Sequence, residues 1–155
     1  MSNPDPAEAV LVDTDVYSYL LSDKGHAAVY RKHVDGKLLA VSFVTVGELY
    51  YGAAKKGWGE QRTNDLKDRL RSTIIVPYDA ELCMTYADVK NKTRSKGRVV
   101  ADNDLWIACC AIRHSIPLVT NNWKHFKEIP GLVVKSEVQA MREIQSQGNL
   151  EPTEV

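Results

Sequence analysis

The chain has 155 residues, of which 44% are hydrophobic and 26% are charged, and its 20 basic and 20 acidic side chains cancel. This size fits one domain, the apolar content excludes a disordered polymer, and no apolar run approaches the about 20 residues of a membrane-spanning helix. The first residues do not resemble a secretory signal and the three cysteines lack a zinc-site spacing, so we expect a reduced, cytoplasmic protein.

Short apolar runs alternate with longer helical patterns along most of the chain. The runs are rich in Val, Leu and Ile and suit strands buried on both faces, whereas the segments between them have helical spacing and several end at a glycine. We expect strands at residues 9–12, 38–42, 73–76, 116–120 and 132–134. We expect helices at residues 14–21, 25–34, 44–56, 60–71, 79–96 and 105–112, with room for one more after residue 137.

This alternation predicts the fold class. Strands that are each followed by a helix form a parallel sheet with helices on both faces. We therefore expect an α/β protein, a three-layer α/β/α sandwich with a central parallel sheet of four to five strands. The domain is expected at residues 9–135, with a loose lead-in at 1–8 and a flanking segment at 136–155. In such sheets the functional site lies beyond the carboxyl ends of the strands.

Acidic side chains fall at those strand ends. Asp13 and Asp15 follow the first strand, Glu48 lies on the helix after the second, and Asp102 and Asp104 open the apolar helix before the fourth. Two such charges about 4 Å apart repel by about 4 kcal/mol at an effective dielectric near 20, so a cluster needs a cation. Oxygen ligands without His or Cys favour Mg²⁺ or Mn²⁺, which activate water for attack at phosphorus.

Each of these residues also has a simpler interpretation. Asp13, and either Asp102 or Asp104, are plausible caps of the helices that they precede. Glu48 is equally well explained by an ion pair with a lysine or arginine, and Asn122 by a turn after the fourth strand.

Four segments carry a family resemblance: LVDTDVYSYLL, VSFVTVGELYYGA, DNDLWIACCAI and LVTNNWKHFKEIPGL. In this order and spacing they resemble PIN-domain ribonucleases and, more narrowly, the VapC-type toxins of bacterial toxin–antitoxin pairs. The similarity covers about residues 9–135. It implies a PIN-like sandwich, Mg²⁺-dependent endoribonuclease activity on RNA, a cognate antitoxin, and a homodimer within a larger toxin–antitoxin complex.

The resemblance also assigns residues by position. Asp13, Glu48 and Asp104 match the family's three core acids and are expected to hold the metal. Asn122 stands where many members place a fourth acid, and we expect it to orient the metal's ligand shell by hydrogen bonds. The supporting residues are Thr14 and Thr120 with hydroxyls near the site, Asp15 ordering the first loop where the family usually has Asn, and Asp102 reaching the metal through water.

Cations on either side of the acids are candidates for binding RNA phosphates. Lys55 and Lys56 follow the Glu48 helix, and Arg94, Lys96 and Arg98 lead toward the Asp102 cluster. The alternative interpretation is a solvated helix end and loop.

Several aromatic and nucleophilic residues have weaker interpretations. Trp106 and Trp123 either pack in the core or stack on a base, and His114 and His125 are given no catalytic role. The two adjacent cysteines of the apolar helix are expected to be small buried hydrophobes. The pair of tyrosines at residues 50 and 51 suggests the groove in which this family commonly accepts an antitoxin segment.

Two other functions remain open on the sequence. The Asp13-x-Asp15 pair after a strand also resembles the first motif of haloacid-dehalogenase-type phosphatases, although Tyr17 stands where these usually have Thr or Val. A PIN-like module that binds RNA or a partner without cleavage is favoured only by Asn122. We expect the Mg²⁺-dependent endoribonuclease.

Overall fold

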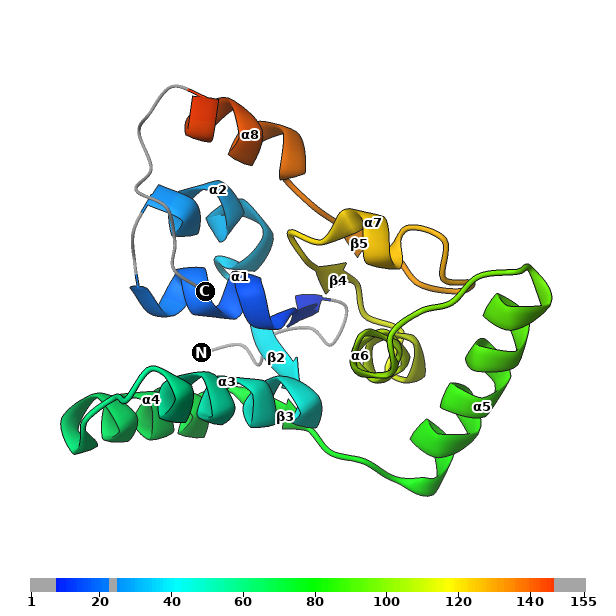
Figure 1. The fold of residues 1–155 in the computed structure, drawn as a ribbon, viewed down its shortest axis with the longest axis horizontal. Coiled ribbons are helices and arrows are strands. Elements are labelled where there is room, and N and C mark those ends of the chain that lie inside the picture. Colours follow the sequence, from blue (N-terminus) through cyan, green and yellow to red (C-terminus); the bar gives the residue numbers. More distant parts are fainter. Residues whose placement is uncertain (1–7, 23–24, 147–155) are drawn as a thin grey trace.

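A central parallel sheet organises the computed structural model, which describes residues 8–22 and 25–146. The strand order is β3-β2-β1-β4-β5, and every neighbouring pair is parallel, as the fold class predicted (Figure 1). The strands are β1 (Ala9–Val12), β2 (Leu38–Ser42), β3 (Ile74–Val76), β4 (Leu118–Val119) and β5 (Val134–Lys135). Their carboxyl ends share one edge of the sheet.

Helices cover both faces of this sheet. They are α1 (Thr14–Ser22), α2 (Gly25–Val34), α3 (Phe43–Lys55), α4 (Glu60–Arg71), α5 (Ala80–Ser95), α6 (Asp102–Arg113), α7 (Trp123–Phe126) and α8 (Val138–Ser146). Residues from α1, α2, α3, α4 and α8 pack into one hydrophobic cluster, and residues from α5, α6 and α7 belong to the other. In the described residues, no helix has both the length and the apolar character needed to cross a bilayer.

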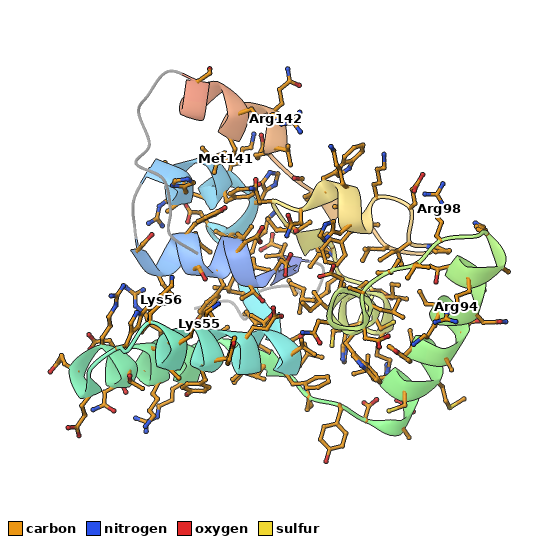
Figure 2. The ribbon with its side chains drawn as sticks, viewed as in Figure 1. Lys55, Lys56, Arg94, Arg98, Met141 and Arg142 are labelled. Carbon is orange, nitrogen blue, oxygen red and sulfur yellow. The ribbon has the colours of Figure 1, made fainter. Side chains whose placement is uncertain are left out.

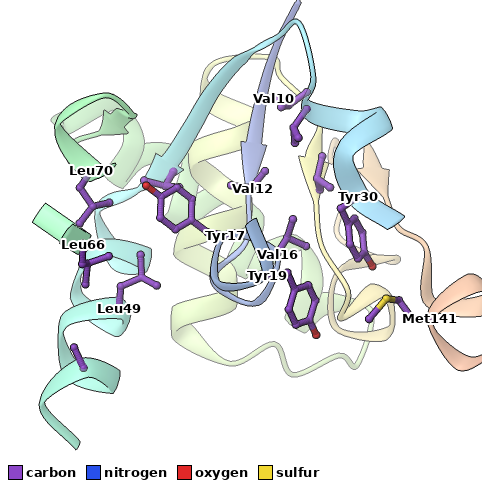
Figure 3. Packing of buried hydrophobic residues seen from close by; sticks show 14 residues of the cluster. Val10, Val12, Val16, Tyr17, Tyr19, Tyr30, Leu49, Leu66, Leu70 and Met141 are labelled. Atoms are coloured by element: carbon purple, nitrogen blue, oxygen red, sulfur yellow. The ribbon is translucent and has the colours of Figure 1, made fainter. Parts of the chain in front are cut away.

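Alternation along β1 explains why the strand is apolar throughout. Val10 and Val12 point into the α1–α2 cluster, and Leu11 between them points into the α6 cluster. Figure 3 shows Val10 and Val12 beside Val16 and Tyr30. A strand buried on both faces has no polar side, and this property made the strand recognisable from the sequence.

Helix boundaries follow ordinary capping chemistry. The Ser42 hydroxyl accepts the backbone N–H groups of Val44 and Thr45, so α3 begins directly at the end of β2. Asp79 caps α5 by accepting the Leu82 N–H at 2.6 Å. Gly97, with φ of 72°, follows α5 in a left-handed conformation that favours glycine.

Several expected boundaries differ from the structure. The strand expected at 116–120 contains two ladder residues, and the one expected at 132–134 lies at Val134–Lys135. Helix α6 begins at Asp102 rather than at residue 105, because the polar residues at its start belong to its first turn. The short helix α7 was not predicted. The expected lead-in and the end of the chain fall largely outside the described residues.

The last helix, α8, packs on α2. Met141 of α8 is buried in the same cluster as Tyr30 of α2 (Figure 3). Just before α8, Glu137 pairs with Lys32 at 2.7 Å and with His33 at 2.8 Å. The segment after β5 is therefore attached to the body of the fold by apolar and ionic contacts.

Candidate active site

Asp13 lies at the carboxyl end of β1 and is buried, with 5% of its surface exposed. Its Oδ1 accepts the Thr14 backbone N–H at 2.7 Å, and its Oδ2 accepts the Thr120 hydroxyl at 2.7 Å. The first bond comes from the first residue of α1, whereas a capping side chain would accept the N–H of Asp15 or Val16. The second joins β1 to the end of β4, so Asp13 is held by two neighbouring strands.

Glu48 reaches the same edge from α3. Its Oε1 accepts the Thr14 hydroxyl at 3.2 Å, and this hydroxyl also lies 3.1 Å from the Thr45 hydroxyl. Thr14 thus binds Asp13 through its backbone and Glu48 through its side chain. Among the described residues Glu48 has this hydroxyl contact and not the ion pair that was its alternative.

Asp104 lies in the first turn of α6, where the helix dipole favours a negative charge. Its Oδ2 is 3.0 Å from Nδ1 of His125, which is carried by α7. The charge of Asp104 raises the pKa of both Asp13 and Glu48, so the three acids interact electrostatically. The structure therefore brings together side chains that are up to 91 positions apart in the sequence.

The pKa values of Asp13, Asp15 and Glu48 are raised. Burial has the largest effect on the pKa of Asp13 and raises it, whereas the hydrogen bond from Thr120 lowers it. Burial and the neighbouring charge of Asp13 raise the pKa of Asp15 to about 7. Burial and Asp13 also raise the pKa of Glu48. These carboxylates are destabilised as anions, and a nearby cation would relieve that cost.

The donor chemistry of this edge fits a hard divalent cation. Carboxylate and hydroxyl oxygens dominate it, and such oxygens are the ligands that Mg²⁺ and similar ions accept. Among the residues that the structure describes, no three His, Cys, Asp or Glu side chains converge closely enough to enclose one ion. Mg²⁺ usually keeps several of its waters, so the arrangement fits an ion that is held partly through water.

Asn122 follows β4 and precedes α7. Its backbone N–H donates to the Thr120 hydroxyl oxygen at 3.0 Å, while its exposed side chain makes no capping bond to α7. The turn interpretation describes its backbone, and its side-chain amide is exposed.

Asp102 and Asp104 do not cap α6, and that alternative is wrong. The cap position is Ala101, and no side chain bonds to the backbone there. Asp102 instead accepts the Lys90 ammonium at 2.8 Å and the Tyr86 hydroxyl at 2.7 Å, and these bonds hold its pKa below the ordinary value. Asp102 is thereby tied to α5.

The basic candidates lie in two separate places (Figure 2). Lys55 and Lys56 lie at the carboxyl end of α3, whereas Arg94 and Arg98 lie at the end of α5 and in the loop before α6. Lys96 caps the same end of α5. A hollow of about 210 Å³ beside the second group is lined by Lys90, Arg94, Arg98, Asp102 and five further residues. Arg98 also forms an ion pair with Glu128.

The aromatic residues divide between core and surface. Trp106 stacks on Tyr86 with centroids 3.9 Å apart and meets Phe43 edge-on, so it packs in the core. Trp123 is 44% exposed, and the Lys127 ammonium lies 4.6 Å from its ring centroid. The two adjacent cysteines of α6 are fully buried, as expected.

His125 was given no role from the sequence, yet its ring contacts Asp104 at this site. It lies two positions after Trp123, on a helix too short to show periodicity, and its contact with Asp104 spans 21 positions. Its place shortly after the fourth strand was the only available signal, because that strand's carboxyl end belongs to the functional edge.

Comparisons with known proteins match most of the chain. A family model described as PIN domain matches residues 10–132. The protein named ribonuclease VapC2 of Rickettsia felis is 30% identical over 130 residues, covering 81% of this chain and 96% of its own. The tRNA(fMet)-specific endonuclease VapC of Shigella flexneri is 25% identical over 79% of this chain and 92% of its own.

Solved structures show the same arrangement. VapBC2 from Rickettsia felis, bound to a DNA fragment from its promoter, contains a chain with a TM-score of 0.72 and 27% identity. The match covers 83% of this chain and 98% of that one. VapBC-1 from nontypeable Haemophilus influenzae gives a TM-score of 0.70 and 28% identity, covering 83% of this chain and 97% of that chain.

Proposed function

Because this chain belongs to the PIN domain family, together with the VapC ribonucleases, we propose that it is a metal-dependent endoribonuclease and the toxin of a toxin–antitoxin pair. The observation that supports this most directly is the set of interacting acids at the carboxyl edge of the sheet. Asp13 and Glu48 are linked by Thr14, and the charge of Asp104 contributes to raising the pKa of both. We propose Mg²⁺ as the metal, with Mn²⁺ as a substitute.

In this mechanism Asp13, Glu48 and Asp104 hold the metal directly or through water, and the Asn122 amide orients the ligand shell. When bound, the metal activates water and stabilises the charge that develops on the RNA phosphate. The chain's own contribution is to hold the carboxylates in place before substrate arrives. The hydroxyls of Thr14 and Thr120 do this, since each donates to one of the acids.

The remaining candidates have supporting positions in this proposal. Asp15 orders the first turn of α1, because its Oδ1 accepts the Val16 N–H at 2.7 Å. Asp102 lies at the edge of the proposed site, where its carboxylate binds the Lys90 ammonium of α5.

We propose that RNA crosses the acidic edge between the two basic groups. Arg94, Lys96 and Arg98 supply positive charge on the α5 side, and Lys55 and Lys56 supply it on the α3 side. Phosphate contacts of this kind give affinity that depends strongly on salt. The domain that performs the reaction is proposed to span residues 9–135.

The proposed protein partner is a cognate antitoxin, bound to a homodimer of this chain in the cytoplasm. The structural relatives with which it aligns are VapBC complexes. Tyr50 and Tyr51 of α3 are 36% and 68% exposed, and they offer an apolar surface to such a partner.

The test is RNA cleavage by purified protein over a range of Mg²⁺ concentrations. Asp13→Asn and Asp104→Asn each keep the side-chain shape and remove a charge, and each is expected to lower the rate at least about 100-fold, since even outer-shell partners of a metal contribute 10–100-fold. Asp65→Asn, at an exposed position of α4, is the matched control and should cleave at the wild-type rate. Wild-type rates in both site variants would refute the assignment.

The same assay decides the remaining alternative. RNA binding without cleavage at any Mg²⁺ or Mn²⁺ concentration would select a non-cleaving module. The phosphatase alternative is not supported, because the family model that matches residues 10–132 is the PIN domain.

A further inference from the structure

Tyr30 of α2 is a fully buried residue whose hydroxyl has polar partners in two different segments of the chain. The hydroxyl donates to Oδ1 of Asn121 at 2.6 Å and accepts the backbone N–H of Glu137 at 3.3 Å. A phenylalanine would fill the same space in the cluster without needing polar partners. The hydroxyl therefore serves the two segments that it joins, the turn after β4 and the connection from β5 to α8.

The first of these segments is the turn that holds the acids. Asn121 lies between Thr120, whose hydroxyl donates to Asp13, and Asn122. The Asn121 backbone also lowers the pKa of Asp15, in opposition to the effect of burial. A change in the position of Asn121 would therefore move the Thr120 hydroxyl that donates to Asp13 and alter the electrostatic environment of Asp15.

The second segment lies beyond the part of the chain that the family model matches, which ends at residue 132. Glu137 is fixed by Lys32 and His33 on α2, the helix that also carries Tyr30. Met141 then anchors α8 in the same cluster as Tyr30 (Figure 3). Tyr30 thus connects the segment around Glu137 to the turn after β4.

We propose that Tyr30 and Asn121 are positioning residues of the nuclease site, because their hydrogen bond fixes the β4–α7 turn beside Thr120, whose hydroxyl holds Asp13. The inference rests on the proposed function and deepens it. It assigns a role to two residues that touch neither metal nor RNA and act through Thr120 and the backbone of the turn.

The chain provides a matched control for this proposal. Tyr17 of α1 is also a buried tyrosine of the same cluster, and its hydroxyl is 2.9 Å from the Thr73 hydroxyl, away from the turn after β4. Tyr17→Phe and Tyr30→Phe each remove one buried hydroxyl group and keep the ring. Any difference between the two in catalysis therefore reports on where the bond lies and not on its loss alone.

The experiment measures kcat, KM for RNA, Mg²⁺ affinity by calorimetry and the melting temperature in the full-length protein. Tyr30→Phe is expected to lower kcat up to about tenfold, in line with one hydrogen bond, and to weaken Mg²⁺ binding, with KM unchanged. Tyr17→Phe is expected to lower only the melting temperature. Asn121→Ala breaks the same bond from its other side, and adding it to Tyr30→Phe should produce no further loss of kcat.

Equal kcat and Mg²⁺ affinity in Tyr30→Phe and Tyr17→Phe would overturn the proposal, as would independent, multiplying effects of Tyr30→Phe and Asn121→Ala. Absence of cleavage by the wild type would count against the proposed function instead. The Mg²⁺ affinities of the two tyrosine variants would still test the positioning role in that case.

Discussion

Asp15 gives the sharpest test of the electrostatics at the acidic edge. The pKa of its carboxyl is raised from 3.8 to about 7, by burial first and by the charge of Asp13 second. The folded protein therefore holds this proton more tightly than the unfolded chain does. The favourable contribution of the protonated Asp15 carboxyl to stability is fully present below about pH 4 and is lost as the pH rises through about 7.

The magnitude follows from the same pKa values. At 1.36 kcal/mol per pH unit, the ionised Asp15 costs the metal-free protein about 4 kcal/mol above pH 7. Asp15→Asn keeps the shape of the side chain and an oxygen to accept the Val16 N–H, but it cannot ionise. The variant should therefore match the wild type near pH 4 and become more stable, by up to about 4 kcal/mol, near pH 8.

The assay is urea unfolding followed by tryptophan fluorescence, in EDTA, from pH 4 to pH 8. The informative quantity is the difference in the free energy of unfolding between Asp15→Asn and wild type, since contributions of the other titrating groups largely cancel in it. Asp65→Asn on the exposed face of α4 is the control and should show no such trend. Saturating Mg²⁺ should shrink the difference, because the ion offsets the same repulsion.

A difference that stays constant with pH would show that Asp15→Asn changes only a hydrogen bond. A difference that favours the wild type increasingly above pH 7 would refute the reasoning outright, because it would mean that the folded protein stabilises the Asp15 anion.

Two further predictions concern the same edge and its rim. Thr120→Val removes the hydroxyl that donates to buried Asp13 at 2.7 Å, and it should raise the pKa of Asp13 further, weaken Mg²⁺ binding in calorimetry, and lower the free energy of unfolding by about 1–3 kcal/mol. Unchanged Mg²⁺ affinity would contradict it. Replacing Arg94 and Arg98 together by glutamate should weaken RNA binding and reduce the slope of log affinity against log salt, by about 0.7 for each phosphate that the arginines no longer neutralise. An unchanged slope would remove both arginines from the RNA path.

Much of the fold was predictable because burial determines it locally. The strands at residues 9–12 and 38–42 are apolar on both faces, and their boundaries agree with β1 and β2. The strand expected at 116–120 is longer than the two-residue β4, because apolar residues begin before the part of the segment that pairs with β1. The four-residue α7 was missed, since one helical turn carries no periodic pattern.

The acids could be anticipated because parallel strands end at one edge, but their partners could not. The hydroxyl of Thr14 reaches Glu48 across 34 positions, and His125 reaches Asp104 across 21. The capping alternative at Asp102 failed because α6 already begins at that residue, with Ala101 in the cap position, and its carboxylate binds Lys90, twelve positions earlier. Such contacts depend on how α5, α6 and α7 pack, and no spacing in the sequence records that packing.

The described acids with shifted pKa values are of two kinds, and those with raised values lie at the carboxyl edge of the sheet. Asp102 and Glu137 are paired with Lys90 and Lys32, and these lysines hold their pKa values below the ordinary range.

Asp13 and Glu48 accept hydrogen bonds from threonine hydroxyls, and their pKa values are raised all the same, because burial and like charges outweigh those bonds. A hydroxyl fixes a carboxylate without neutralising it, whereas an ammonium ion would occupy the place of a metal. Stability alone would favour lysine partners at the sheet edge as well. The use of hydroxyls there leaves negative charge that a divalent cation can satisfy.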